Sequence, residues 1–160
     1  MKKTKIIKIG SKAIDFILND HNEKPFKLSD FKGKKILLSF HPLAWTSVCA
    51  RQMQSLEKNK KYFDKTNTVA VGISVDPTPS KKAWAKHLNI KNTRLLSDFW
   101  PHGAVAQHYD IFRENDGISK RVNIIIDEEQ NISFFKIYPM SQLPDINELV
   151  RYLEKRKCTD

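Results

Sequence analysis

Short apolar runs, each long enough for one β-strand, recur along the sequence and are separated by stretches of helical periodicity. Residues 36–40 and 69–75 are almost wholly apolar, a pattern typical of strands that are covered on both faces. Between these runs, Cys49, Met53 and Leu56 recur at spacings of four and three residues, which places them on one face of a helix. A buried strand, a helix and a second buried strand in this order predict a parallel crossover, and therefore an α/β fold.

The second half of the chain adds further strands to the predicted sheet. Residues 122–127 and 132–138 are predicted strands, and the short polar turn between them fits a hairpin. The other predicted elements are short strands at 5–9, 16–18, 26–28 and 94–96, a helical turn or tight loop at 29–34, and helices from Cys49 through Phe63, from Pro79 through Leu88, at 101–109 and from near Pro144. We therefore expect a central mixed β-sheet flanked by helices on both faces, with an N-terminal β extension.

Length and composition favour a single domain over residues 1–160. Hydrophobic residues make up 40% of the chain, which suffices for a sizeable core, and no internal repeat or Gly/Ser linker divides it. No apolar run approaches the ~18 residues that a membrane helix needs, so we expect no membrane partner. The start of the chain does not resemble a secretory signal, and two distant cysteines do not form a dense disulfide framework. Both features favour a cytoplasmic location.

Charge and motifs argue against several classes of partner and cofactor. The formal net charge of +10 raises nucleic acid as a partner, but the lysines are scattered and are not interleaved with aromatic residues. No nucleic-acid-binding motif appears, so we expect no specific nucleic-acid partner. The five histidines show no metal-ligand spacing, and no nucleotide-binding glycine loop is present. We therefore expect no cofactor.

The loop at residues 42–49 delivers a cysteine to the start of a predicted helix. If Thr46 is the N-cap, Cys49 is the third helical residue, where unpaired backbone N–H groups and the positive end of the helix dipole favour a thiolate. The parallel crossover places Cys49 at the carboxyl end of its strand, where sites form in open α/β sheets. The alternative is an inert core cysteine, since Cys49 also lies on the apolar stripe with Met53 and Leu56.

Three residues of this loop carry a resemblance to a known family. Pro42, Thr46 and Cys49 form the pattern Pro-x-x-x-Thr-x-x-Cys, which resembles the active-site loop of the peroxiredoxins, thiol peroxidases with a thioredoxin-like fold. Residues 26–34 resemble the segment that precedes the catalytic strand in that family. Residues 97–103, Ser-Asp-Phe-Trp-Pro-His-Gly, are similar to the one-cysteine branch related to alkyl hydroperoxide reductase E. The resemblance extends over nearly the whole chain.

The resemblance implies a role for four residues. Cys49 would attack the terminal oxygen of a hydroperoxide and become a sulfenic acid, and Thr46 would donate to and accept from the bound peroxide. Pro42 would shield the thiolate and fix the loop. Arg121 stands just before the predicted strand at 122–127, where the family places its active-site arginine, and would hold the thiolate and the peroxide oxygens. Taken alone, Thr46 could be an ordinary helix cap, Arg121 a surface ion pair and Pro42 a strand end.

The second cysteine, Cys158, leaves the return to the reduced state open. In two-cysteine relatives a second thiol resolves the sulfenic acid, and basic residues at 155–157 would favour a Cys158 thiolate. The alternative is a tail cysteine without a role, with the sulfenic acid cleared by an external thiol. The resemblance implies an external thiol reductant, a thioredoxin-like or other small redox protein, as a partner. The resemblance also implies a homodimer, with residues 100–102 as a candidate contact.

The predicted function is therefore thiol-dependent reduction of hydrogen peroxide or organic hydroperoxides. A thiol–disulfide oxidoreductase is disfavoured, because Gln52 stands where a Cys-x-x-Cys motif would place its second cysteine. The alternative from another class is a non-enzymatic redox sensor or holdase-like binding protein that uses the same Cys49. His41, which precedes Pro42, either lines the pocket and titrates near neutrality or packs as a flat ring, and we favour packing.

Overall fold

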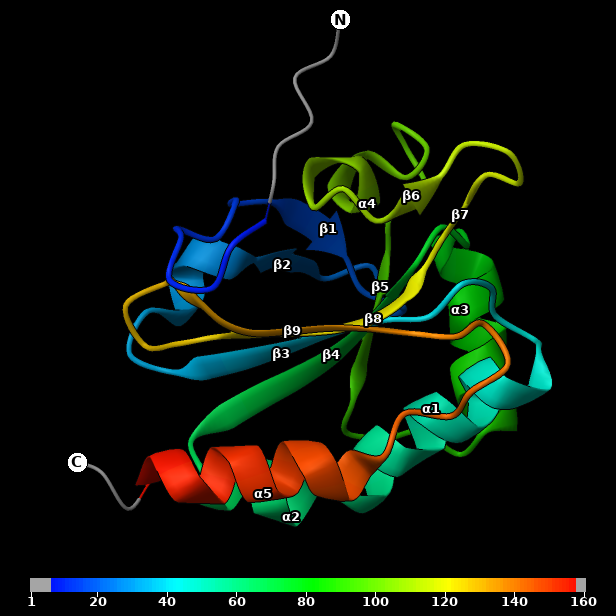
Figure 1. Cartoon of the computed structure of the whole chain (residues 1–160). Coiled ribbons are helices and arrows are strands. Elements are labelled where there is room, and N and C mark those ends of the chain that lie inside the picture. The colour runs from blue at the N-terminus through cyan, green and yellow to red at the C-terminus, as the bar shows by residue number, and fades with distance from the viewer. Residues whose placement is uncertain (1–6, 158–160) are drawn as a thin grey trace, which may run out of the picture.

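Five strands form the central sheet: β3 (Lys35–Phe40), β4 (Thr68–Ser74), β5 (Arg94–Ser97), β8 (Arg121–Ile126) and β9 (Ile132–Tyr138). Their spatial order is β5-β4-β3-β8-β9 (Figure 1) in this computed structural model, which describes residues 7–157. β3 is parallel to β4, and β4 to β5, whereas β8 is antiparallel to both β3 and β9. The prediction of a mixed sheet, with a hairpin near its end, is confirmed.

Helices cover both faces of the sheet, but unequally (Figure 1). One face packs against the longer helices, α1 (Ser47–Lys58), α2 (Lys60–Lys65), α3 (Thr78–His87) and α5 (Ile146–Lys157). The opposite face packs against α4 (Ala104–His108), the 3-10 helix η1 (Leu28–Phe31) and the hairpin of β1 (Ile17–Asn19) and β2 (Pro25–Lys27). That hairpin is the predicted N-terminal β extension.

The position of β3 in the middle of the sheet explains why its sequence is a nearly continuous apolar run. All six of its residues are buried, with Ile36 and Leu38 in the layer toward the N-terminal hairpin and Leu37 in the layer toward α1 and α5. A strand covered on both faces must fill every position with an apolar or a hydrogen-bonded side chain. Ser39 is of the second kind, since its hydroxyl donates to Asn123 Oδ1 at 2.7 Å.

Three predicted elements differ from the structure. The strand predicted at 5–9 is wrong for the described part, 7–9, where Ser11 N–H instead closes a turn onto the Lys8 carbonyl at 3.1 Å; residues 5 and 6 lie outside the described residues. The helix predicted from Cys49 through Phe63 is two helices, α1 and α2, which are separated at Asn59. The helix predicted at 101–109 begins only at Ala104, because Gly103 has a left-handed backbone with φ of 68°.

Other differences are smaller. α3 begins at Thr78, so that Pro79 is the second rather than the first helical residue, and α3 ends at His87. The hairpin of β6 (Phe112–Arg113) and β7 (Ile118–Ser119) was not predicted, because strands of two residues leave no periodicity to detect.

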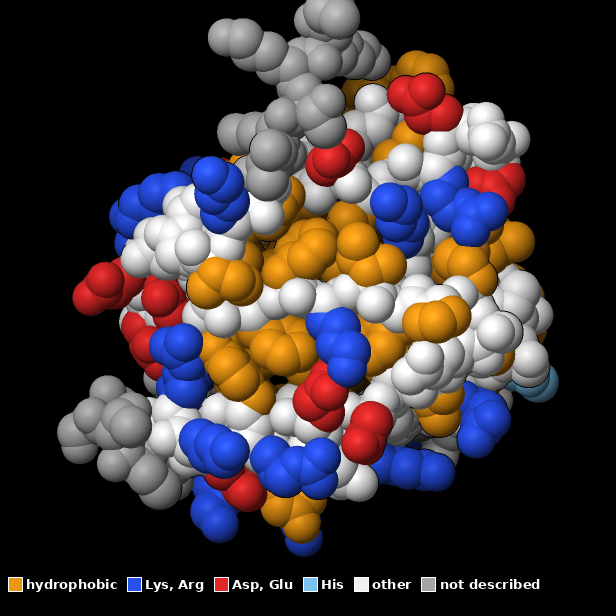
Figure 2. Space-filling model, in the orientation of Figure 1, with side chains coloured by type: hydrophobic (Ala, Val, Ile, Leu, Met, Phe, Trp, Pro, Cys, Tyr) orange, Lys and Arg blue, Asp and Glu red, His pale blue; other side chains and the backbone are white. Residues whose placement is uncertain are grey.

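The strand β9 forms one edge of the sheet and faces the viewer in Figure 1. Figure 2 shows hydrophobic side chains gathered over the middle of this face and lysine and arginine side chains spread around it. One of the exposed apolar residues of this strand is Ile137, which is 48% exposed. Within residues 7–157, none of the helices combines the length and the apolar character needed to cross a bilayer.

Candidate active site

The loop between β3 and α1 carries Pro42, Thr46 and Cys49. β3 ends at Phe40 and α1 begins at Ser47, and the helix returns the chain to the parallel strand β4. Cys49 therefore lies at the carboxyl end of β3, as the sequence predicts. Thr46 is the N-cap residue of α1 and Cys49 its third residue. The thiol of Cys49 is free and only 1% exposed.

The loop is anchored on the start of α3 and the segment before it. Ala44 N–H donates to Asp76 Oδ2 at 2.9 Å. Trp45 has a left-handed backbone with φ of 68°, an uncommon conformation for a bulky residue that persists only where its surroundings fix it. Its indole Nε1 donates to Ser80 Oγ at 3.1 Å, and its ring lies 5.4 Å from that of His87. These contacts hold the loop against α3.

The Thr46 hydroxyl does not cap the helix. Its Oγ1 donates to the Leu43 carbonyl at 2.7 Å, and no side-chain cap satisfies the first turn of α1. Among the described residues, no acceptor is found for the backbone N–H groups of residues 47–49. The site thus combines free backbone donors at the positive end of a helix with the Thr46 hydroxyl. The oxygen of this hydroxyl can still accept a hydrogen bond while its hydrogen is donated to Leu43.

The antiparallel pairing of β8 with β3 brings Arg121 to the cysteine. Phe40 is opposite Val122, so Arg121, one residue earlier in β8, lies beside the end of β3. Arg121 Nη1 donates to Cys49 Sγ at 3.4 Å. Arg121 Nε and Nη2 both donate to the Met140 carbonyl, at 3.2 and 2.8 Å. Arg121 is only 3% exposed, so it is not the surface ion pair that its sequence position alone would allow.

Gln52 is a site residue for which the sequence predicted no role. Its Oε1 accepts a bond from Arg121 Nη1 at 2.7 Å, and its Nε2 donates to Ser39 Oγ at 2.7 Å and to the Phe40 carbonyl at 3.2 Å. The amide thus fixes the guanidinium relative to β3 without adding a charge. The signal in the sequence is a polar residue three positions after Cys49, hence on the same buried helix face.

A second buried cation lies behind the loop. Lys81 Nζ is 2.9 Å from His41 Nε2 and donates to Ser74 Oγ at 2.7 Å, and both Lys81 and His41 are fully buried. Burial lowers the pKa of Lys81 to about 7, although Asp76 and Cys49 act in the opposite direction. Burial, with Lys81 next to it, lowers the pKa of His41 well below its usual value, so the ring is neutral near pH 7. His41 packs 5.3 Å from the ring of Trp84, which agrees with the packing interpretation.

The structure says less about the other two predicted site residues, Pro42 and Cys158. Pro42 is buried at the beginning of the loop, next to Leu43, which is 40% exposed. Cys158 lies outside the residues that the structure describes. The structure therefore brings Cys49, Thr46 and Arg121 together at one strand end, with Pro42 in the same loop.

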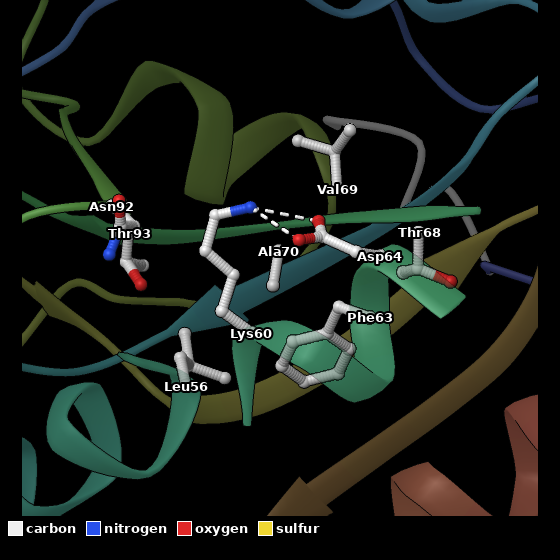
Figure 3. Close-up of a pocket in the computed structure, with 9 residues that line it drawn as sticks. All are labelled: Leu56, Lys60, Phe63, Asp64, Thr68, Val69, Ala70, Asn92 and Thr93. Atoms are coloured by element: carbon white, nitrogen blue, oxygen red, sulfur yellow. Dashed lines mark hydrogen bonds and ion pairs between the residues drawn. The ribbon is translucent and has the colours of Figure 1, made fainter. Parts of the chain in front are cut away.

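A pocket elsewhere on the molecule lacks comparable chemistry. Figure 3 shows it between α1, α2 and β4, with the side chains of Lys60 and Asp64 paired across it at 2.8 Å. Leu56 and Phe63 supply apolar walls. Neither Cys49 nor Arg121 lines this pocket, so it is separate from the candidate active site.

The arrangement at Cys49 suits nucleophilic chemistry at sulfur. A helix start and a neighbouring guanidinium both supply positive charge that interacts favourably with a thiolate, the reactive form of cysteine. The same guanidinium and the free N–H groups can stabilise negative charge on a substrate oxygen. Within the described part of the chain, no group of three or more His, Cys, Asp or Glu residues is placed to hold a metal ion.

Comparison with known proteins gives a consistent result. The model of the AhpC/TSA family matches residues 9–135. Alkyl hydroperoxide reductase E of Mycobacterium tuberculosis is 36% identical over 141 residues, which cover 88% of this chain and 92% of that protein. Peroxiredoxin-1 of Gekko japonicus is 31% identical and covers 95% of this chain and 80% of its own length. The crystal structure of reduced Plasmodium vivax 2-Cys peroxiredoxin superposes with a TM-score of 0.85 at 25% identity, covering 94% of this chain and 82% of that one.

Proposed function

The chain belongs to the AhpC/TSA family of peroxiredoxins and is a thiol-dependent peroxidase, and from this premise we propose that Cys49 is its peroxidatic residue. The observation that carries the proposal is the 3.4 Å contact between Arg121 Nη1 and Cys49 Sγ at the start of α1. It pairs the only cysteine among the described residues with a permanent cation. The substrates are hydrogen peroxide or organic hydroperoxides.

The proposed reaction is a displacement at oxygen. The Cys49 thiolate attacks the terminal oxygen of R–O–O–H, the S–O bond forms and the O–O bond breaks. The sulfur loses two electrons and becomes a neutral sulfenic acid, and R–O⁻ takes up one proton to leave as R–OH. Negative charge moves from sulfur to the leaving oxygen, so groups that contact both ends of this path lower the barrier most.

Three further residues have proposed roles in this step. Arg121 stabilises the thiolate and then the leaving oxygen, and its bonds to Gln52 and Met140 keep it in place. Thr46 accepts a hydrogen bond from the peroxide hydroxyl, since its own hydrogen is donated to the Leu43 carbonyl. Pro42, buried at the beginning of the loop, shields the thiolate from water.

An external thiol is the proposed reductant of the sulfenic acid. One thiol condenses with Cys49–SOH to a mixed disulfide and water, and a second thiol releases the Cys49 thiolate. The reductant is a thioredoxin-like or other small redox protein. The competing route uses Cys158, the only other cysteine in the sequence.

One experiment tests both the nucleophile and the resolving thiol. The reduced protein is treated with one equivalent of hydrogen peroxide, run on a non-reducing gel and analysed by mass spectrometry. A sulfenic acid on Cys49 that persists until an external thiol is added supports the proposal. A Cys49–Cys158 disulfide would instead assign resolution to Cys158, and an unmodified Cys49 would overturn the peroxidatic assignment.

The assembly and setting of the enzyme are also proposals. A homodimer is supported by the exposure of Phe99 (48%) and Trp100 (81%), which line a groove together with Ile17 and Pro79. Sedimentation of the wild type and a Trp100→Glu variant tests it, since the variant should be monomeric. A single domain over residues 1–160 is supported by the one central sheet that receives strands from both halves of the chain. A cytoplasmic location is supported by the requirement for an external thiol reductant.

A further inference from the structure

Lys81 is a fully buried ammonium group that forms no ion pair with a carboxylate in the described part of the chain. Its two hydrogen-bond partners are neutral: Ser74 Oγ at 2.7 Å and His41 Nε2 at 2.9 Å. A buried charge without a direct ion-pair partner is costly, so the charges farther from Lys81 decide whether it keeps its proton.

Charged and titratable groups face Lys81 from several elements. Asp76, after β4, accepts from Ser74 Oγ at 2.6 Å, and its negative charge raises the pKa of Lys81. Cys49, on α1, raises the pKa of Lys81 through its negative charge. Two histidines also lie near these charges. The positive charges of Lys81 and Arg121 lower the pKa of His41, and the positive charge of Lys81 contributes to lowering the pKa of His21.

Lys81, Arg121, Asp76 and Cys49 together carry no net charge when Lys81 is protonated and Cys49 is a thiolate. Lys81 and Arg121 then supply two positive charges, and Asp76 and Cys49 two negative charges. Oxidation to the sulfenic acid removes one negative charge. Arginine does not lose its proton in proteins, whereas a buried lysine does so readily. With a pKa of about 7, Lys81 is the group able to restore the balance near neutral pH.

We propose that Lys81 compensates the change of charge at Cys49 during the peroxidase reaction. It carries a proton while Cys49 is a thiolate and releases that proton when the sulfur is oxidised. The proposal rests on Cys49 being the peroxidatic residue. The oxidation step is then Cys–S⁻ + ROOH + Lys–NH₃⁺ → Cys–SOH + ROH + Lys–NH₂. The S–O bond forms and the O–O bond breaks. Lys81 releases one proton for each proton that the leaving oxygen takes up. When an external thiol regenerates the thiolate, the thiol proton returns to Lys81.

Proton uptake during oxidation tests this exchange directly. The reduced protein in weak buffer at about pH 7 is mixed with one equivalent of hydrogen peroxide and a pH indicator in a stopped-flow instrument. Loss of thiolate is followed by its ultraviolet absorbance, so that protons are counted per thiolate consumed. We expect the wild type to take up well below one proton per thiolate, because Lys81 supplies part of it.

Two variants complete the test. Lys81→Met, which keeps the length of the side chain without the charge, should take up one full proton per thiolate. Lys82→Met, at the exposed neighbouring position of α3, should match the wild type. Equal uptake in the wild type and Lys81→Met would overturn the proposal for Lys81 while leaving Cys49 as the peroxidatic residue. Failure of peroxide to oxidise Cys49, seen as no loss of thiolate, would overturn the proposed function itself.

The wild type alone provides a second test that does not depend on the folding of a variant. At about pH 9, Lys81 has already lost its proton in the reduced protein, so uptake should rise to one proton per thiolate. Uptake that stays constant between about pH 7 and about pH 9 would contradict the proposal.

Discussion

Arg121 Nη1 contacts two residues of α1 at once, donating to Cys49 Sγ at 3.4 Å and to Gln52 Oε1 at 2.7 Å. Because these two residues are three positions apart, they lie on one face of the helix, and the guanidinium is held across that face. The opposite side of the guanidinium is held by the Met140 carbonyl. The position of the cation is therefore set by the backbone after β9 as well as by α1.

Arg121→Ala should lower the second-order rate constant with peroxide by about 10²-fold or more, by analogy with loss of one transition-state donor. A thiolate that is made more stable is also a weaker nucleophile, so stabilising the Cys49 thiolate alone cannot account for fast peroxide reduction. Stopped-flow rates measured together with the thiolate fraction separate the two effects. Arg113→Ala, which removes an arginine of an exposed ion pair, is the control and should keep the wild-type rate. An Arg121→Ala rate explained fully by a lower thiolate fraction would contradict this role.

Gln52→Leu should reduce both stability and activity. The substitution leaves the Phe40 carbonyl and one N–H of Arg121 without their partners in a buried region, at a cost of about 2–3 kcal/mol in the free energy of unfolding. The freed guanidinium should also lower the peroxide rate by about tenfold. Gln54→Leu on the same helix is the matched control. Denaturant unfolding and stopped-flow kinetics check the two effects, and a variant with wild-type rates would show that Arg121 does not need Gln52.

Thr46→Val should lower the rate with peroxide by about 10²-fold, whereas Thr46→Ser should retain most of it. The proposed function of the hydroxyl is to accept from the peroxide while it donates to the Leu43 carbonyl, and serine preserves both bonds. Competition kinetics against a peroxidase of known rate provide the measurement. If valine and serine variants lose activity equally, the hydroxyl is not the group responsible.

The buried Lys81 should make the protein more stable as the pH rises from about 7 to about 9. In the unfolded chain this lysine keeps its proton up to its usual pKa of 10.5, whereas in the folded protein it loses the proton at about 7. Between these values the unfolded state binds more protons, so the free energy of unfolding increases with pH, by about 2 kcal/mol over two pH units for this group.

Lys81→Met should remove this rise, and Lys82→Met should preserve it. Denaturant unfolding at the two pH values gives the difference between each variant and the wild type. A Lys81→Met variant with the same pH dependence as the wild type would mean that Lys81 does not titrate in this range.

The strand–helix–strand unit around the cysteine could be predicted because its signals are local. The apolar runs of β3 and β4, the stripe of Cys49, Met53 and Leu56, and the N-cap at Thr46 all act within a few residues of the chain. The same local patterns did not reveal the break at Asn59 between α1 and α2. A helix stripe continues through such a break when the following turn returns to the same face.

The partners of the cysteine could not be predicted from local pattern, because they depend on burial produced by distant segments. Lys81 stands in a lysine-rich stretch and has the composition of a solvated helix face. Its spacing of three from the buried Trp84 was the available signal, and it places Lys81 on the inward face of α3. Gln52 follows the same rule on α1. Arg121 was placed by resemblance, and the register of β8 against β3 supplies the physical reason.

The reaction rate of Cys49 with peroxide is the sharpest test of its assignment as the peroxidatic residue. Reduced wild-type protein, Cys49→Ser and Cys158→Ser are each mixed with hydrogen peroxide in a stopped-flow instrument under identical conditions. We expect the wild type and Cys158→Ser to react at the same rate, many orders of magnitude faster than free cysteine, as enzymatic acceleration requires. Cys49→Ser should react no faster than free cysteine, through Cys158 alone. A wild-type rate equal to that of free cysteine would contradict the assignment of Cys49, Arg121 and Thr46 as the peroxide-reducing site.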